Sequence, residues 1–268
     1  MHTHPVPRHL AVLMVLALLA FGPPPAVAQE EGDPDVPEEK PTAEALAEDA
    51  IHHLAAWRHT KARELLEPVE KSVQSEAPLA TAWALTLAEE GEPGQAVEML
   101  AEAAEDVPSD PAPLYWKGEV HYWTGDYGPA GEAWGRALER ARNAVEADAD
   151  NPRANYYLGA TLIRNRAFAD AREPLETALE GGWDEAATRY QLGLSYYFDK
   201  KWSKGKEAFD AAIQADPTFA HAYYYRGRAW KEMGRTDEMM LDMERFLELA
   251  GDSREAAIAR SLLRAGQG

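Results

Sequence analysis

Residues 186–219 read AATRYQLGLSYYFDKKWSKGKEAFDAAIQADPTF, and this stretch decides the fold. Its first half carries apolar residues three or four positions apart. A break at Lys200 follows, and then a second run with the same spacing, which ends before Pro217. That spacing predicts two amphipathic helices joined by a tight turn. One such hairpin cannot bury its apolar faces alone, so further copies are expected to stack on it.

The same pattern recurs along the chain with a period of 34 residues. A glycine in the middle of the first helix returns at Gly159, Gly193 and Gly227. Six units result, over residues 43–76, 77–110, 111–151, 152–185, 186–219 and 220–253. A small residue on each helix should let the two backbones approach closely. Large residues in the second helices are expected to fill the space between hairpins: Leu100, Trp134, Leu175, Phe209 and Met243.

The third unit is longer than the others by seven residues, around Arg140 to Glu146. These residues favour helix, so the second helix of this unit is predicted to be extended. A tolerated insertion explains the extra turns more simply than a functional one. After the last unit, Ser253 can cap a final helix within residues 254–268, which would cover the apolar edge of the array.

The repeated unit resembles the tetratricopeptide repeat, and it does so over residues 43–253. The signature residues in the fifth unit are Leu192, Gly193, Tyr196, Gly205, Phe209, Ala212 and Pro217. The resemblance implies an all-α fold, a right-handed α-solenoid of antiparallel helix hairpins. It also implies a non-enzymatic scaffold that binds a protein or peptide partner.

The first 42 residues are of a different kind from the repeats. Arg8 precedes a short apolar run from Leu10 to Phe21, and Ala26-Val27-Ala28 follows prolines, as in a cleaved secretory signal over residues 1–28. The alternative is an uncleaved membrane anchor. Residues 29–42 are acidic and proline-rich, which is typical of a disordered linker. We therefore expect an exported protein, periplasmic or secreted, with no stable membrane insertion after cleavage.

Composition excludes several functions. The formal net charge of −19 disfavours nucleic acid as a partner, and the absence of cysteine excludes thiolate metal sites and a cysteine nucleophile. No nucleophile, phosphate-binding or metalloprotease motif occurs. Glu48, His52 and His53 lie on one predicted helix, but a metal site needs three or four converging ligands. We therefore predict neither an enzyme nor a cofactor.

The resemblance also implies where a partner binds, because first-helix residues of such arrays line a concave groove. The matching residues here are mostly aromatic or cationic. They are Tyr115, Glu119, Tyr122, Trp123, Arg153, Tyr156, Arg164, Tyr190, Tyr197, Phe198, Tyr224, Arg228 and Lys231. Exposed tyrosine and tryptophan favour binding, and arginine pairs with carboxylates. The alternative is that these aromatic residues pack against neighbouring helices.

Two functions fit these features. The first is a protein–protein interaction scaffold of the cell envelope that holds a peptide or partner helix in the groove. The second is a scaffold for polysaccharide export or glycan binding, since aromatic platforms with Arg and Glu also suit sugars. The sequence specifies neither the partner nor the oligomeric state.

Overall fold

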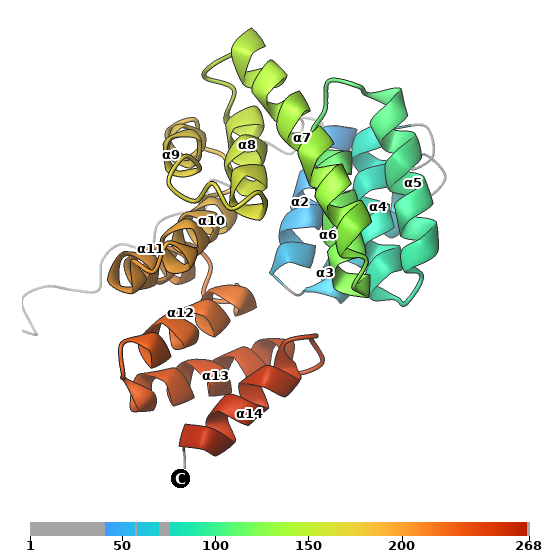
Figure 1. Ribbon diagram of the computed structural model, residues 1–268. Helices are drawn as coiled ribbons and strands as arrows, with labels where there is room; N and C mark the ends of the chain where they lie inside the picture. Colours follow the sequence, from blue (N-terminus) through green and yellow to red (C-terminus); the bar gives the residue numbers. More distant parts are fainter. Residues whose placement is uncertain (1–40, 57, 70–75, 267–268) are drawn as a thin grey trace, which may run out of the picture. The chain divides into compact units, whose positions relative to one another are not determined.

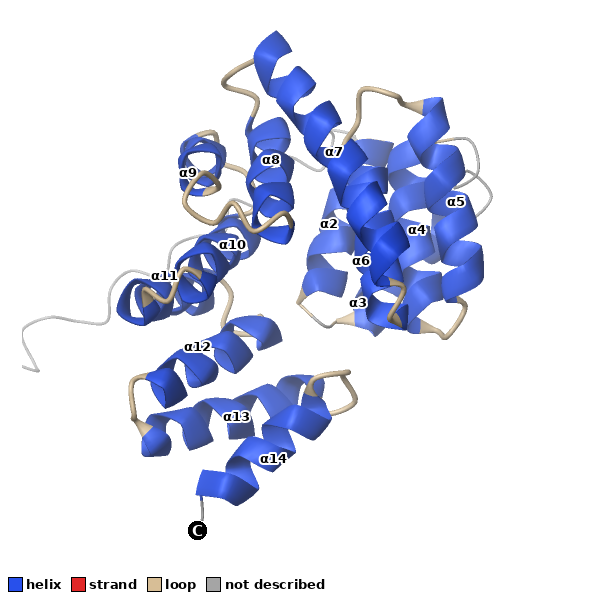
Figure 2. Ribbon diagram, in the orientation of Figure 1, coloured by secondary structure: helices blue, strands red, loops and turns tan. Residues whose placement is uncertain are grey.

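The computed structural model describes residues 41–56, 58–69 and 76–266 (Figure 1). Thirteen helices and no strand lie in these residues (Figure 2), so the predicted all-α fold is confirmed. The predicted signal over residues 1–28, most of the predicted linker and the last two residues lie outside the described part.

The helices form six antiparallel hairpins that follow one another in chain order (Figure 1). Each hairpin occupies one of the six ranges marked out by the period, to within one residue. The hairpins are α2 (Ala43–Ala55) with α3 (His59–Leu66), α4 (Ala77–Glu89) with α5 (Pro93–Asp106), α6 (Ala112–Thr124) with α7 (Tyr127–Ala147), α8 (Pro152–Arg164) with α9 (Arg172–Glu180), α10 (Glu185–Phe198) with α11 (Trp202–Ala215), and α12 (Ala220–Glu232) with α13 (Thr236–Ala250). A last helix, α14 (Ala256–Gly266), packs on α13.

The hairpins stack in two layers. The first helices of successive hairpins contact one another, from α2 through α4, α6, α8 and α10 to α12, and form the inner layer. Each second helix contacts the first helix of its own hairpin and that of the next. This arrangement buries the apolar faces that one hairpin would leave in water, and it places the predicted groove residues on the inner layer.

Within a hairpin, a glycine of the first helix faces a large residue of the second. A Cβ added at Gly118, Gly159, Gly193 or Gly227 would lie under 3.0 Å from a side-chain atom, which belongs in turn to Trp134, Leu175, Phe209 or Met243. The large side chains therefore pack inside their own hairpins. The missing glycine side chain leaves room for them there, and the expected packing between hairpins occurs as well, since the ring centroid of Phe209 lies 6.1 Å from that of Tyr225 in the next hairpin.

The predicted breaks between helices coincide with left-handed backbone. Gly125 has φ of 87° at the end of α6, and Lys200 has φ of 59° between α10 and α11. Glycine adopts this conformation without strain, which explains its place in most of these turns. Arg166 takes the same conformation after α8, where the sequence has no glycine.

The prediction of a longer second helix in the third unit is confirmed by α7, which runs for 21 residues. Arg140 on this helix donates hydrogen bonds to the backbone carbonyls of Val107 and Asp110, at 3.4 and 3.2 Å.

At the end of the array, Ala259 of α14 is buried with Met243 and Phe246 of α13. The last helix thus covers an apolar edge that would otherwise be exposed.

The first hairpin also contacts residues far along the chain. Nδ1 of His52 lies 2.5 Å from an Asp184 carboxylate oxygen, and Nε2 lies 3.3 Å from Asp216. Arg58 donates a 2.9 Å hydrogen bond to Thr218. These contacts join α2 and the turn after it to the segments that precede α10 and α12. The inner layer is consequently closed by the chain itself on one side.

Candidate functional site

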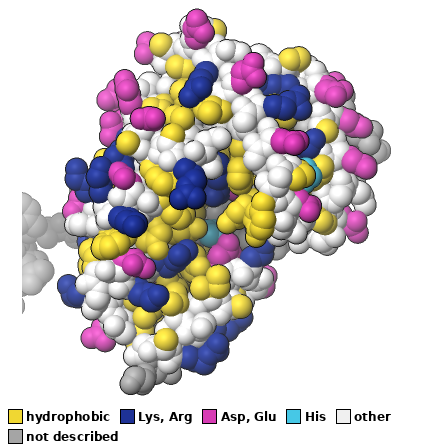
Figure 3. Space-filling model, viewed as in Figure 1, with side chains coloured by type: hydrophobic (Ala, Val, Ile, Leu, Met, Phe, Trp, Pro, Cys, Tyr) yellow, Lys and Arg dark blue, Asp and Glu magenta, His cyan; other side chains and the backbone are white. Residues whose placement is uncertain are grey.

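A cavity of about 170 Å³ lies among the inner helices. We call it the central cavity. Figure 3 shows hydrophobic side chains gathered around a hollow in the molecule, with cationic side chains among them. Eight of the thirteen predicted groove residues line it: Tyr115, Glu119, Tyr122, Trp123, Tyr156, Arg164, Tyr190 and Phe198. The structure thus brings together residues from α6, α8 and α10.

These residues form a partly enclosed cavity and not an open groove. Tyr115, Glu119 and Tyr156 are only 2%, 3% and 6% exposed, because the inner helices pack closely around them. Tyr122, by contrast, is 47% exposed and packs edge-on against Tyr127. The prediction of exposed aromatic platforms therefore fails for the deep residues. It holds for Tyr122.

The wall of the central cavity contains a buried ion pair. Nε and Nη2 of Arg164 donate hydrogen bonds of 2.6 Å each to the two carboxylate oxygens of Glu119. Burial raises the pKa of Glu119, while the guanidinium of Arg164 opposes that rise. The guanidinium also stands 5.6 Å from the ring centroid of Trp134. Because its charge is already matched, Arg164 is not available as a carboxylate clamp in this conformation.

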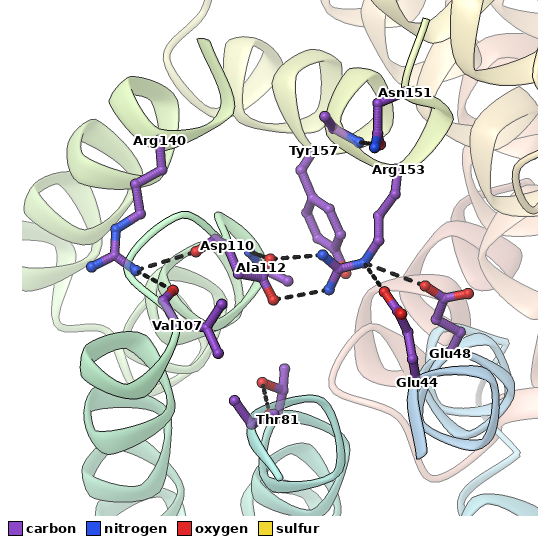
Figure 4. Close-up of polar contacts among 12 residues, drawn as sticks. Glu44, Glu48, Thr81, Val107, Asp110, Ala112, Arg140, Asn151, Arg153 and Tyr157 are labelled. Atoms are coloured by element: carbon purple, nitrogen blue, oxygen red, sulfur yellow. Dashed lines mark hydrogen bonds and ion pairs between the residues drawn. The ribbon is translucent and has the colours of Figure 1, made fainter. Parts of the chain in front are cut away.

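Arg153, another predicted groove cation, is also engaged by the chain (Figure 4). Nη1 and Nη2 donate hydrogen bonds of 2.8 and 3.0 Å to Asp110, and Nε lies 3.3 Å from Glu48 of α2. Glu44 is at 4.0 Å, and the ring of Tyr157 lies under the guanidinium. Arg153 therefore ties α8 to α2 and to the loop before α6.

The remaining predicted residues lie elsewhere on the inner layer. Tyr224, Arg228 and Lys231 of α12 line a second cavity, of about 140 Å³. We call it the end cavity; its other lining residues are Glu232, Ile258 and Leu262. Tyr197 is 8% exposed, and its ring centroid is 5.4 Å from the Arg228 guanidinium carbon. Eight of the thirteen residues thus line the central cavity and three line the end cavity, while Arg153 lies in its own cluster and Tyr197 packs beside Arg228.

Sequence reasoning missed several residues of the central cavity. Trp116 and Tyr225 each directly follow a predicted groove residue, so a wider choice of inner-face positions would have included them. Arg254 and Glu255 also line the cavity, but they lie beyond the last repeat, where the period gives no guidance. Arg254 reaches a Glu89 carboxylate oxygen at 2.9 Å and lies over the ring of Trp123.

The histidines considered as metal ligands lie beside carboxylates of the same chain. His52 pairs with two aspartates as described, and Nε2 of His53 lies 3.6 Å from Asp49. Within the described residues there is no group of three or more His, Asp or Glu side chains that could hold a metal ion. None of the described helices is both long and apolar enough to cross a membrane.

The stacked hairpins and their inner cavities define a helical-repeat interaction scaffold. The family model for the tetratricopeptide repeat matches residues 81–142, 130–186 and 190–238, which is more than half of the chain. The chain therefore belongs to the tetratricopeptide repeat family, whose members bind protein or peptide partners. No curated protein matches the sequence.

Solved structures share the fold at low sequence identity. The tetratricopeptide protein TTC0263 from Thermus thermophilus is 20% identical, with a TM-score of 0.55 over 70% of this chain and 98% of that one. The Cut9–Hcn1 hetero-tetramer of the APC/C is 17% identical, with a TM-score of 0.53 over 85% and 43%. YrrB, described as having an unusual peptide-binding site, is 21% identical, with a TM-score of 0.40 over 77% and 99%.

Proposed function

We propose that this protein is a non-enzymatic interaction scaffold of the cell envelope, and that its central cavity receives part of a peptide or of a partner helix. The observation that carries the proposal is the convergence of aromatic side chains from three successive inner helices on one cavity. Aromatic side chains supply large contact areas at low entropic cost, so they dominate binding energy where they can be reached.

The volume of the cavity defines what can enter it. Ligand pockets for drug-sized molecules measure roughly 300–1,000 Å³, and this cavity is smaller, at about 170 Å³. It accommodates one or two side chains of a partner, while the rest of the partner contacts the rim near Tyr122 and Trp123. A helix lying along the whole inner layer would need the first hairpin to move away.

The envelope location rests on residues 1–28, which have the features of a cleaved export signal. The test is to express the full chain in a bacterial host and fractionate the cells. The mature protein is expected in the periplasm or medium, beginning at Gln29 on N-terminal sequencing. Full-length protein retained in the cytoplasm would overturn this part of the proposal.

A glycan is the second candidate for the central cavity, and one observation favours it. Charged groups that line the cavity are paired with groups of opposite charge, as Glu119 with Arg164 and Glu89 with Arg254. A cavity whose charges are paired in this way, with aromatic walls, suits a neutral hydroxylated ring as well as a side chain. Parallel binding assays with peptides and with oligosaccharides separate these two ligands.

The experiment for the scaffold proposal is affinity capture of the mature protein from its native envelope, followed by mass spectrometry. A protein partner should be retained by wild type and lost when Tyr122→Ala and Trp123→Ala are combined at the rim. Leu241→Ala is the matched control, because Leu241 is 66% exposed on α13 and lines neither cavity. A partner that the rim variant still binds with full affinity would exclude the central cavity as its site.

A further inference from the structure

Arg228 differs from the other arginines of the inner layer in what surrounds it. Its guanidinium carbon lies 5.4, 5.6 and 5.4 Å from the ring centroids of Tyr197, Tyr224 and Tyr225. Among the residues that the structure describes, it forms no ion pair with a carboxylate. Arg153 and Arg164 both do. The hydroxyls of Tyr197 and Tyr224 accept hydrogen bonds from Arg228, but they are neutral and leave its charge unmatched. A half-buried cation has lost part of its hydration, so one without a carboxylate favours an incoming anion.

The cation next to it points to the same conclusion. Lys231 follows Arg228 by one helical turn, lines the end cavity and is exposed. It too has no ion pair within the described part of the chain. Glu232 lines the same cavity and is exposed, but it is not within ion-pair distance of either cation. Two cations and one carboxylate leave the end cavity with a net positive charge in a protein whose net charge is −19.

The opposite wall of the end cavity is apolar. It is formed by α14, where Ile258 is 52% exposed and Leu262 is half-buried. Ile258 is one of four large hydrophobic residues exposed in the described part of the chain. A ligand that satisfied Arg228 alone would leave this wall in water. The occupant that fits both walls therefore carries an anionic group beside an apolar one.

We propose that the end cavity binds an acidic segment of a partner protein, with a carboxylate side chain on Arg228 and an adjacent large apolar side chain against Ile258. This inference rests on the proposed function, because it takes the partner to be a protein, but it assigns a different cavity. The volume of about 140 Å³ admits side chains and excludes a folded element. A short segment in an extended conformation is favoured over an acidic domain. The overall negative charge of the protein would repel the large acidic surface of a domain.

The probe is the peptide Gly-Ser-Glu-Leu-Glu-Leu-Gly-Ser, with an amino-terminal fluorophore and an amidated carboxyl end. Its binding to the full mature chain is followed by fluorescence polarisation, and a matched peptide carries Gln in place of Glu. The Glu peptide should bind about tenfold more tightly, which is the effect of roughly one charge-assisted hydrogen bond. Arg228→Gln should remove that preference, and Lys231→Gln should weaken Glu-peptide binding about two- to threefold.

Two further variants separate the walls of the cavity. Ile258→Ser should weaken both peptides equally, because it removes apolar contact and leaves the cations in place. Arg245→Gln is the matched control, since Arg245 pairs with Glu248 at 2.8 Å on α13 and does not line the cavity. Lys231 and Ile258 are exposed, so their variants should fold even if Arg228→Gln does not.

The outcomes decide between sites. Equal affinity for the Glu and Gln peptides, or a Glu preference that survives Arg228→Gln, would overturn the inference. Glu-peptide binding that is lost in the Tyr122→Ala, Trp123→Ala variant and retained in Arg228→Gln would move the site to the central cavity, leaving the proposed function intact. Dodecanoate that binds tightly at Arg228 while neither peptide does would also contradict it, by replacing the peptide with a fatty acid.

Discussion

The arginines in the middle of the inner layer and the arginine at its end have different surroundings. In the middle, Arg153 lies beside three carboxylates of the same chain (Figure 4). Arg164 is held by one, that of Glu119. At the end, Arg228 lies among tyrosine rings and meets no carboxylate in the described part of the chain. Both regions derive from equivalent first helices, so the repeat itself does not determine which cation is satisfied.

The difference separates cations that hold the fold together from a cation that is available to a ligand. Removing one member of a buried pair leaves the other charge desolvated and unmatched, which is costly to the folded state. Removing a cation that has no carboxylate partner leaves no buried charge unpaired. The two classes should therefore differ in unfolding experiments, and the following changes are ordered from the largest expected effect to the smallest.

Arg164→Gln should have the largest effect on stability. It would strand the carboxylate of Glu119, which is 3% exposed, and we expect the free energy of unfolding to fall by about 3–5 kcal/mol. Urea denaturation followed by circular dichroism measures this. Adding Glu119→Gln should recover part of the loss. A fall below about 1 kcal/mol would show that water reaches the pair and would weaken the contrast with Arg228.

Arg153→Gln should have the next largest effect. Asp110 is 8% exposed and would lose two charge-assisted hydrogen bonds, so the free energy of unfolding should fall by about 2–3 kcal/mol. The matched control is Arg189→Gln, which removes a pair with Glu185 one helical turn away at the surface and should cost less than about 0.5 kcal/mol. Equal losses in the two variants would contradict the role given to Arg153.

The third largest effect on stability is expected from His52, whose contact with Asp184 and Asp216 should depend on pH. Burial alone would lower the pKa of His52, but the hydrogen bond and charge of Asp184, with Asp216, raise it above 6.5. Arg58 and His53 are also close, and the charge of Arg58 opposes that rise, while burial lowers the pKa of His53 itself. Both ring nitrogens face carboxylates, which requires the imidazolium if each is to donate.

Because the folded-state pKa is the higher one, the stabilisation is fully present below the unfolded-state value and is lost as the pH rises through the folded-state value. The difference in unfolding free energy between wild type and His52→Gln should therefore be largest at about pH 6 and shrink at alkaline pH. Urea denaturation at a series of pH values measures it. A difference that grows with pH would mean that the neutral ring makes the contact.

The smallest effect on stability is expected from Arg228→Gln. Contacts with three tyrosine rings and hydrogen bonds to the hydroxyls of Tyr197 and Tyr224 are lost, but no carboxylate is left unpaired, so the free energy of unfolding should fall by only about 1 kcal/mol. The same substitution should nevertheless remove the preference for acidic peptides. A stability loss as large as that of Arg164→Gln would indicate a structural role for Arg228 and would erase the comparison.

The hairpins can be predicted from the sequence because their contacts are local. Helix pairs, the turn at Gly125 and the longer helix around Arg140 all follow from apolar spacing and turn residues within one unit. The face on which Tyr122 and Tyr156 lie follows in the same way, since the period places equivalent residues on the same layer.

The closure of the inner layer cannot be predicted in this way. His52 meets Asp184 across 132 residues, and Arg58 meets Thr218 across 160. Such contacts depend on small rotations that add up from repeat to repeat, and the period does not encode them. The carboxylate partners of Arg153 and Arg164 cannot be predicted either, because they come from other units: Glu119 from the preceding hairpin, Asp110 from the loop before it, and Glu48 from the first hairpin.

The glycine of each later hairpin and the large residue opposite it are separated by the same number of residues, as in Gly193 with Phe209 and Gly227 with Met243. In the second hairpin the same offset joins Ala84 to Leu100, both fully buried. The two positions thus share a fixed volume that can be divided in more than one way. To redesign such a repeat, both positions must be changed together. A larger side chain at one position then requires a smaller one at the other, so that their summed volume stays the same.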